Sequence, residues 1–225
     1  MLRYLLISLF ILFFSGIKAQ TVVINSHQEE KRDQSGLSLG IDIAPFILVA
    51  FQPERRGAAF IGRYQFKERW FIVGEAGYAN VNFDKDSYAY KSNGGFLKIG
   101  ADYNFFKVNE PGNNDNITAG IRYGIATQTH QSPRYTIIDD YWGNYTGEFP
   151  TSNVTSHYID FVGGLRTEVL KNFFMGWTIR LKVLMAAKTN NVLKPYTIPG
   201  YGKGDNTINV GFTYTLEYQI PFKKK

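Results

Sequence analysis

The sequence predicts an all-β protein: an eight-stranded, antiparallel, up-and-down transmembrane β-barrel of the outer-membrane type, with a lumen filled by charged side chains. Three observations lead to this fold. Apolar and polar residues alternate along eight segments, charged residues of both signs occupy the polar face of nearly every segment, and the connections tend to be alternately short and long. An alternation with a period of two is typical of a strand whose two faces meet different surroundings.

Four segments carry the alternation most clearly. In NTINVGFTYTLEYQIPF, residues 206–222, every even-numbered position from 208 onward is apolar and most odd-numbered positions are polar. The segments GGFLKIGADYNFF, ITAGIRYGIATQ and FFMGWTIRLKVLM repeat this pattern at residues 94–106, 117–128 and 173–185. Each is long enough to cross a bilayer as a tilted strand, which takes about 9 to 11 residues.

Four weaker segments complete the eight strands. They lie at residues 37–46, 58–66, 70–81 and 158–169. No segment after residue 36 has the 3.6-residue period of an amphipathic helix, so no helix is expected in this part of the chain.

The connections indicate which ends of the strands lie together. The links KER and KN, after the second and sixth strands, are tight, whereas DKDSYAYKSN, residues 130–155 and residues 189–205 form long links after the third, fifth and seventh strands. Short turns at one end and long loops at the other are typical of outer-membrane barrels. The link after the fourth strand is longer than this rule predicts, and the first outer loop near QPERRG is shorter.

The charged face is expected to point inward. It carries six acids and six bases, a balance that suits a lumen in which buried charges must be paired. The expected lumen charge network consists of Asp42, Arg63, Glu75, Lys98, Asp102, Arg122, Asp160, Arg166, Glu168, Arg180, Lys182 and Glu217.

The apolar face is then expected to meet lipid, where only helices and closed barrels satisfy every backbone group. Aromatic residues gather at strand ends beside the short turns, as an interfacial girdle would. A soluble sandwich also alternates, but its apolar face points into a core, and a lipocalin-like barrel would invert the two faces. The expected girdle is Phe66, Trp70, Phe105, Phe173, Tyr218 and Phe222.

The amino-terminal stretch MLRYLLISLFILFFSGIKAQ reads as a secretory signal peptide, because its apolar run is too short to span a membrane. Removing its two basic residues leaves 23 basic and 19 acidic side chains, a net charge of +4 that is too small and too scattered to indicate nucleic acid. We therefore expect a signal peptide at residues 1–19, a flexible periplasmic leader at 20–36, the barrel at 37–222 and a basic tail at 223–225. The predicted location is the cell outer membrane.

Several segments together resemble a known family. The runs GGFLKIGADYN, AGIRYGIAT, YTIPGYGKGDN and YTLEYQIPFKKK are similar to the Bacteroidota outer-membrane barrels grouped as domain of unknown function 6048. The resemblance covers most of the chain after the signal, and its most specific part is the IPG element followed by a strand that ends in IPF. It implies the fold and the location but no catalytic residue. The terminal aromatic Phe222 also resembles the signal read by the barrel assembly machinery during insertion, although three lysines follow it.

Candidate chemistry is sparse. The stretch TSHYID offers Ser156, His157 and Asp160, but adjacent residues of a strand point to opposite faces, so the Ser–His pair cannot act directly as nucleophile and base. The chain has no cysteine, and its three histidines are not spaced as metal ligands, so neither a metal nor a cofactor is expected. A calcium ion at Asp139 and Asp140 is the weaker alternative to two solvated acids.

The long loop at residues 130–155 is rich in aromatic residues, which are common in surfaces that bind a partner or a glycan. The alternative is that they cap the barrel mouth. We expect a non-enzymatic structural or interaction subunit of an envelope protein complex; a lipid A-modifying enzyme of the acyl hydrolase type and a narrow channel are the alternatives. The expected partner surface is Tyr135, Tyr141, Trp142, Tyr145 and Phe149.

Overall fold

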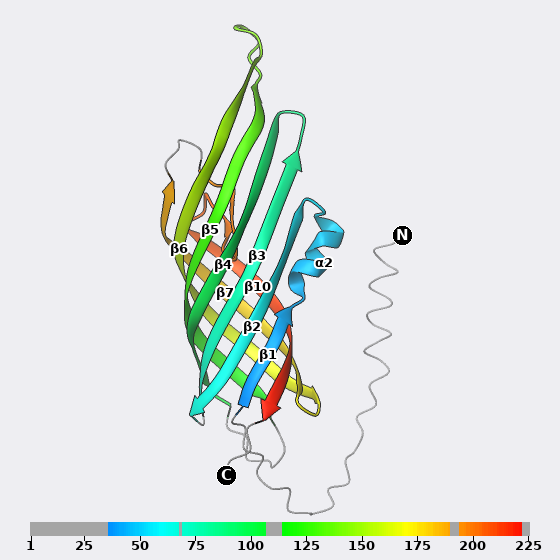
Figure 1. The fold of residues 1–225 in the computed structure, drawn as a ribbon, viewed down its shortest axis with the longest axis vertical. Helices are drawn as coiled ribbons and strands as arrows, with labels where there is room; N and C mark the ends of the chain where they lie inside the picture. The colour runs from blue at the N-terminus through cyan, green and yellow to red at the C-terminus, as the bar shows by residue number, and fades with distance from the viewer. Residues whose placement is uncertain (1–35, 68, 107–113, 190–193, 222–225) are drawn as a thin grey trace, which may run out of the picture. The chain divides into compact units, whose positions relative to one another are not determined.

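The computed structural model describes residues 36–67, 69–106, 114–189 and 194–221. The predicted signal peptide, most of the leader, Phe222 and the basic tail lie outside these residues. Eight antiparallel strands close into a barrel in the order β1-β10-β7-β6-β5-β4-β3-β2, and β8 and β9 form a separate two-stranded sheet (Figure 1). The elements are β1 Gly36–Asp42, α2 Ala44–Phe51, β2 Arg55–Lys67, β3 Trp70–Asp84, β4 Tyr88–Asn104, β5 Asn116–Ile137, β6 Tyr145–Leu170, β7 Phe173–Thr189, β8 Thr197–Ile198, β9 Gly202–Lys203 and β10 Ile208–Pro221.

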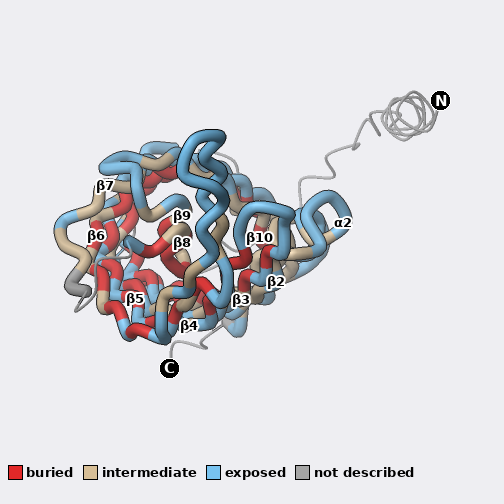
Figure 2. Tube along the Cα trace, turned by 90° about the horizontal axis from the view of Figure 1, so that it is seen from above, coloured by how far each residue is buried: buried red, intermediate tan, exposed pale blue. Residues whose placement is uncertain are grey.

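The predicted fold class and the predicted facing of the strands are confirmed. Polar residues of alternate positions are buried inside the barrel, for example Arg122 and Asp160, whereas their apolar neighbours Ile121 and Phe161 are exposed on its outside. Figure 2 shows this change between buried and exposed positions along the barrel strands. Charged and polar side chains therefore fill the centre of the barrel, and apolar side chains cover its outside.

The prediction that no helix follows the signal is wrong. The strand expected at residues 37–46 ends at Asp42, and the chain continues as α2, which lies outside the barrel ring beside β2 and β10 (Figure 2). The sequence APFILVAF does not alternate, and Pro45 occupies the first turn of the helix, where proline is tolerated because that backbone N–H has no intrahelical acceptor. Among the described residues, no helix has both the length and the apolar character needed to span a membrane.

Two of the predicted long loops are instead strand hairpins. The strands β3 and β4 pair up to Asp84 and Ala89, and β5 and β6 pair up to Ile137 and Tyr145. The β5–β6 hairpin therefore extends beyond the other strands (Figure 1). Threonine, tyrosine and phenylalanine favour extended backbone, and these residues continue through the segment after its apolar alternation has ended. We call this end of the barrel the hairpin end and the opposite end, where β2 joins β3 and β6 joins β7, the short-turn end.

Candidate functional site

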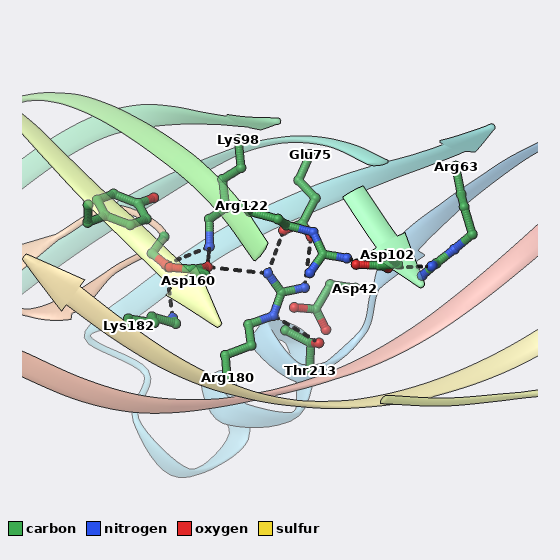
Figure 3. Close-up of polar contacts among 12 residues, drawn as sticks. Asp42, Arg63, Glu75, Lys98, Asp102, Arg122, Asp160, Arg180, Lys182 and Thr213 are labelled. Carbon is green, nitrogen blue, oxygen red and sulfur yellow. Dashed lines mark hydrogen bonds and ion pairs between the residues drawn. The ribbon is translucent and has the colours of Figure 1, made fainter. Parts of the chain in front are cut away.

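The lumen is organised around one carboxylate, Glu75 on β3. Arg180 donates two hydrogen bonds to it, from Nη1 to Oε2 at 2.8 Å and from Nη2 to Oε1 at 2.9 Å. Arg122 places its Nε 2.9 Å from Oε1 of the same carboxylate. All three side chains are buried, and Figure 3 shows the two guanidinium groups converging on Glu75. A bidentate pair together with a second cation is the arrangement that best compensates a carboxylate removed from water.

From this centre the network continues toward the short-turn end. Asp102 bridges two guanidinium groups, with Arg122 Nη2 at 2.9 Å and Arg63 Nη1 at 2.6 Å from its Oδ2. Glu217 accepts a hydrogen bond from Nε of Arg166 at 3.0 Å, and Nε of Arg63 lies 3.5 Å away. The chain of alternating charges thus links strands β2, β4, β5, β6 and β10.

Two residues that sequence reasoning missed, Ser38 and Phe174, contact Arg166 at the short-turn end of the charge network. Arg166 donates a hydrogen bond to Ser38 Oγ at 2.8 Å, and its guanidinium carbon lies 3.5 Å from the centre of the Phe174 ring. Both partners are buried. Phe174 lies six residues before Arg180 on β7, so the two side chains share a face of the strand. The inward direction of Phe174 could therefore have been predicted from that of Arg180.

Toward the hairpin end, Asp160 on β6 is the main acid. Lys98 donates a hydrogen bond to its Oδ2 at 2.7 Å, and Nη1 of Arg180 lies 3.5 Å from the same oxygen. Lys98 also donates to the backbone carbonyl of Gly200 at 3.0 Å. The network is therefore tied to a segment of the chain that does not belong to the barrel wall.

Three members of the predicted network stand apart from these ion pairs. Asp42 accepts hydrogen bonds from the backbone N–H groups of Ala44 and Tyr214, at 3.0 and 3.2 Å. Lys182 donates to the Gly200 carbonyl at 2.9 Å and has no carboxylate within 4 Å among the described residues. Glu168 lies half-buried at the short-turn end, where it accepts hydrogen bonds from the Asn172 N–H and the Asn114 side chain.

The hairpin end of the lumen is filled by residues 194–207, which contain β8 and β9. Ile198 and Tyr201 are fully buried against Tyr158 and Ala126 of the barrel wall. Tyr158 donates a hydrogen bond to the Pro199 carbonyl at 3.3 Å, and Tyr201 donates to the Asn206 carbonyl at 2.8 Å. We call residues 194–207 the plug. Sequence reasoning placed a long loop here, and only the family resemblance singled out its IPG element.

Gly200 is the point at which the plug touches the charge network. Its φ of +69° is a left-handed conformation that favours glycine. A Cβ at this position would lie 2.6 Å from Cγ of Phe96 and 2.6 Å from the hydroxyl oxygen of Tyr158. Glycine is therefore required here both for the turn and for the close approach that brings its carbonyl to Lys98 and Lys182.

The TSHYID stretch does not assemble a catalytic constellation. Ser156 is buried on the lumen side of β6, whereas His157 on the outer side has its Nδ1 2.7 Å from the Tyr123 hydroxyl. Asp160 is engaged with Lys98. No cluster of three or more His, Cys, Asp or Glu side chains that could hold a metal ion occurs within the described part of the chain.

The predicted aromatic surface divides between the stem and the tip of the β5–β6 hairpin. On the stem, the Tyr135 ring stacks on Phe149 with centroids 4.8 Å apart and lies 6.3 Å from Tyr145. At the tip, Tyr141 and Trp142 are 84% and 83% exposed and contact each other edge to face. The plug, rather than these tip rings, occupies the mouth of the lumen.

Asp139 holds the tip in its turn. Its Oδ1 accepts hydrogen bonds from the backbone N–H groups of Trp142 and Tyr141, at 2.7 and 2.8 Å. These donors lower the pKa of the Asp139 carboxyl below its ordinary value. Asp139 therefore serves as a turn-forming residue with its own carboxylate already engaged.

Five of the six predicted girdle residues lie at the short-turn end, and the sixth, Phe222, lies outside the described residues. Phe66, Trp70, Phe105 and Tyr218 are between 43% and 60% exposed, and Phe173 is half-buried at the start of β7. Trp70 and Phe105 both pack edge to face on Tyr103, with centroids 5.1 and 4.9 Å away. These aromatic side chains therefore lie on the outside of the barrel at this end.

The crystal structure of Ail, the attachment invasion locus protein of Yersinia pestis, is similar to this chain, with a TM-score of 0.41 and 10% sequence identity over 82% of this chain and 96% of that chain. No curated protein matches the sequence significantly. The family model described as domain of unknown function DUF6048 matches residues 1–225. The resemblance to this family is confirmed, and the chain belongs to the DUF6048 family.

Proposed function

We propose that this chain is an integral outer-membrane barrel that acts as a non-enzymatic structural or interaction subunit of an envelope assembly. Its outward positions support membrane residence: Leu97, Ile99, Ile179 and Val210 are all more than 60% exposed, and such side chains suit lipid rather than water. Most of the inward charges form ion pairs, as a dry or narrow lumen requires.

The observation that carries the interaction role is the tip of the β5–β6 hairpin. Tyr141 and Trp142 are exposed at the end of a stem whose own aromatic residues are packed together. Large aromatic side chains held on a rigid element lose little entropy on binding and dominate many interfaces. The hairpin thus offers an ordered aromatic surface for another envelope protein.

A photocrosslinking amino acid at position 142 tests this role. In cells with the barrel in the outer-membrane fraction, we expect one discrete crosslinked protein after gentle extraction and mass spectrometry. The matched control places the same amino acid at Tyr218, which is also exposed but lies at the short-turn end. Barrels that reach the outer membrane and give no discrete crosslink at position 142, or the same products at both positions, would contradict the interaction role.

The filled lumen leads to a separate prediction about conduction. An eight-stranded barrel is just wide enough for its side chains, and here ion pairs and the plug occupy it. We expect the purified, folded protein to produce no discrete conductance steps in planar bilayers. Reproducible single-channel steps would support the narrow-channel alternative instead.

A further inference from the structure

The barrel wall is interrupted between β2 and β10. Pairing of β1 ends at Asp42, opposite Ala59 on one side and Thr215 on the other. Beyond this level, the edges of β2 and β10 that face each other have no strand between them. Because neighbouring strands lie about 4.8 Å apart, two strands that flank a missing one are separated by roughly 10 Å.

Asp42 fixes the position of this opening. Its carboxylate accepts the Tyr214 N–H, the place where a longer β1 would continue the ladder, and it also accepts the Ala44 N–H at the start of α2. The chain then leaves the wall as α2, whose Phe46, Ile47 and Phe51 side chains are 54% to 73% exposed. The opening therefore begins where β1 ends, and the apolar helix α2 lies beside it on the outside of the barrel.

Behind the opening lies a cavity of about 250 Å³. Small side chains of β2 and β3, including Ala59 and Ala79, make room for it, and Leu48 of α2 and Phe212 of β10 line it as well. On the outside, Phe60 and Val210 are 62% and 76% exposed on the two flanking strands. The opening thus lies at a level of the wall where the outer face is apolar.

The inner end of the cavity is positively charged. It is lined by Lys98, Arg180 and Lys182, and by Glu75 and Asp42 as its acids. Lys98 and Arg180 already have carboxylate partners (Figure 3). Lys182 has only the Gly200 carbonyl as a hydrogen-bond acceptor among the described residues, and it is half-buried.

We propose that this cavity is a lateral binding site for a long-chain fatty acid or an equivalent single-chain anionic amphiphile. The carboxylate of this ligand lies at Lys182. Its hydrocarbon chain leaves the barrel between β2 and β10 and runs along α2 into the surrounding lipid. A compact ammonium is a suitable partner for one carboxylate, and the small residues of β2 leave a passage for a single chain. The inference rests on the membrane location in the proposed function.

The test uses the purified, folded full chain in nanodiscs of phosphatidylcholine, a bilayer without net charge. The probe is a fatty acid with a photoreactive group in its chain, and mass spectrometry maps the labelled residues. We expect labelling concentrated at residues 44–59 and 208–213, and a reduction of about tenfold or more in the Lys182→Gln variant, because a charge-assisted hydrogen bond is lost. The matched control Lys203→Gln removes an exposed lysine and should leave the labelling unchanged.

Two further arms complete the experiment. The fatty alcohol with the same chain should not show the concentrated labelling, and Ala79→Leu, which fills the cavity, should reduce labelling by the fatty acid. Labelling spread evenly around the wall, equal labelling by the alcohol, or no effect of Lys182→Gln in a barrel with unchanged heat-modifiable mobility would overturn the inference. A protein that does not fractionate with the outer membrane in cells would instead overturn the proposed function.

Discussion

The Glu75→Gln substitution is expected to lower the free energy of unfolding by about 3 kcal/mol or more, because it removes the charge that compensates two buried guanidinium groups. Glutamine keeps the volume of the side chain, so the change reports on charge rather than on packing. Arg122 would retain Asp102, and Arg180 would retain the more distant Asp160. The lumen as a whole would nevertheless lose one of its buried negative charges.

Equilibrium unfolding in urea, with the protein folded into the same lipid vesicles throughout, measures this effect. The matched control is Asp84→Asn, which breaks the ion pair of Asp84 and Arg134 at 2.9 Å. Those side chains are 78% and 47% exposed, so the loss should stay below about 1 kcal/mol. Equal losses in the two variants would show that the lumen charges are solvated and that burial does not make their pairing important.

The Gly200→Ala substitution is expected to have an effect of similar size on the plug. The left-handed backbone costs about 1–2 kcal/mol for a residue with a Cβ, and forcing a methyl group against Phe96 and Tyr158 adds about 1–3 kcal/mol. The Gly200 carbonyl would then move away from Lys98 and Lys182. We expect a lower thermal midpoint and a loss of the near-ultraviolet circular dichroism of the buried tyrosines.

Gly143→Ala separates the two contributions. Gly143 also has a positive φ, of +80°, but a Cβ there would have no atom within 4 Å beyond its own residue and its two chain neighbours. This control should therefore show only the backbone cost, about 1–2 kcal/mol, confined to the hairpin tip. If Gly200→Ala and Gly143→Ala had the same thermal midpoint, the close packing of the plug would have no energetic role.

The facing of the strands was predictable because alternation has a period of two and a charge in mid-strand determines the phase. Glu75 alone settled the phase of β3, and the structure puts Val73 and Phe71 on the same buried side. The identity of the ion pairs was not predictable, since a partner across the lumen depends on the stagger between strands. Glu75 and Arg180 pair although they are 105 residues apart.

Sequence reasoning missed the elements in which apolar and polar residues do not alternate, because no other pattern in the sequence indicates their structure. The run APFILVAF is apolar throughout, so a period-two or a 3.6-residue pattern is equally compatible with it. In the plug, Tyr201 is buried because the chain returns into the lumen, and neither turn residues nor hydropathy indicate that direction. The length of the β5–β6 hairpin was underestimated because both its faces are polar enough to resemble a loop.

The brevity of β1 also bears on how the barrel is built. The ladder between β1 and β10 joins Gly36 to Pro221 across almost the whole described chain and covers seven residues of β1, whereas β5 and β6, of 22 and 26 residues, are neighbours in sequence. Closing a long loop costs entropy before any pairing offsets it, so local hairpins form ahead of distant seams. We therefore expect folding to begin at the β5–β6 hairpin and to end at the ladder between β1 and β10, so that the seam formed last lies beside α2.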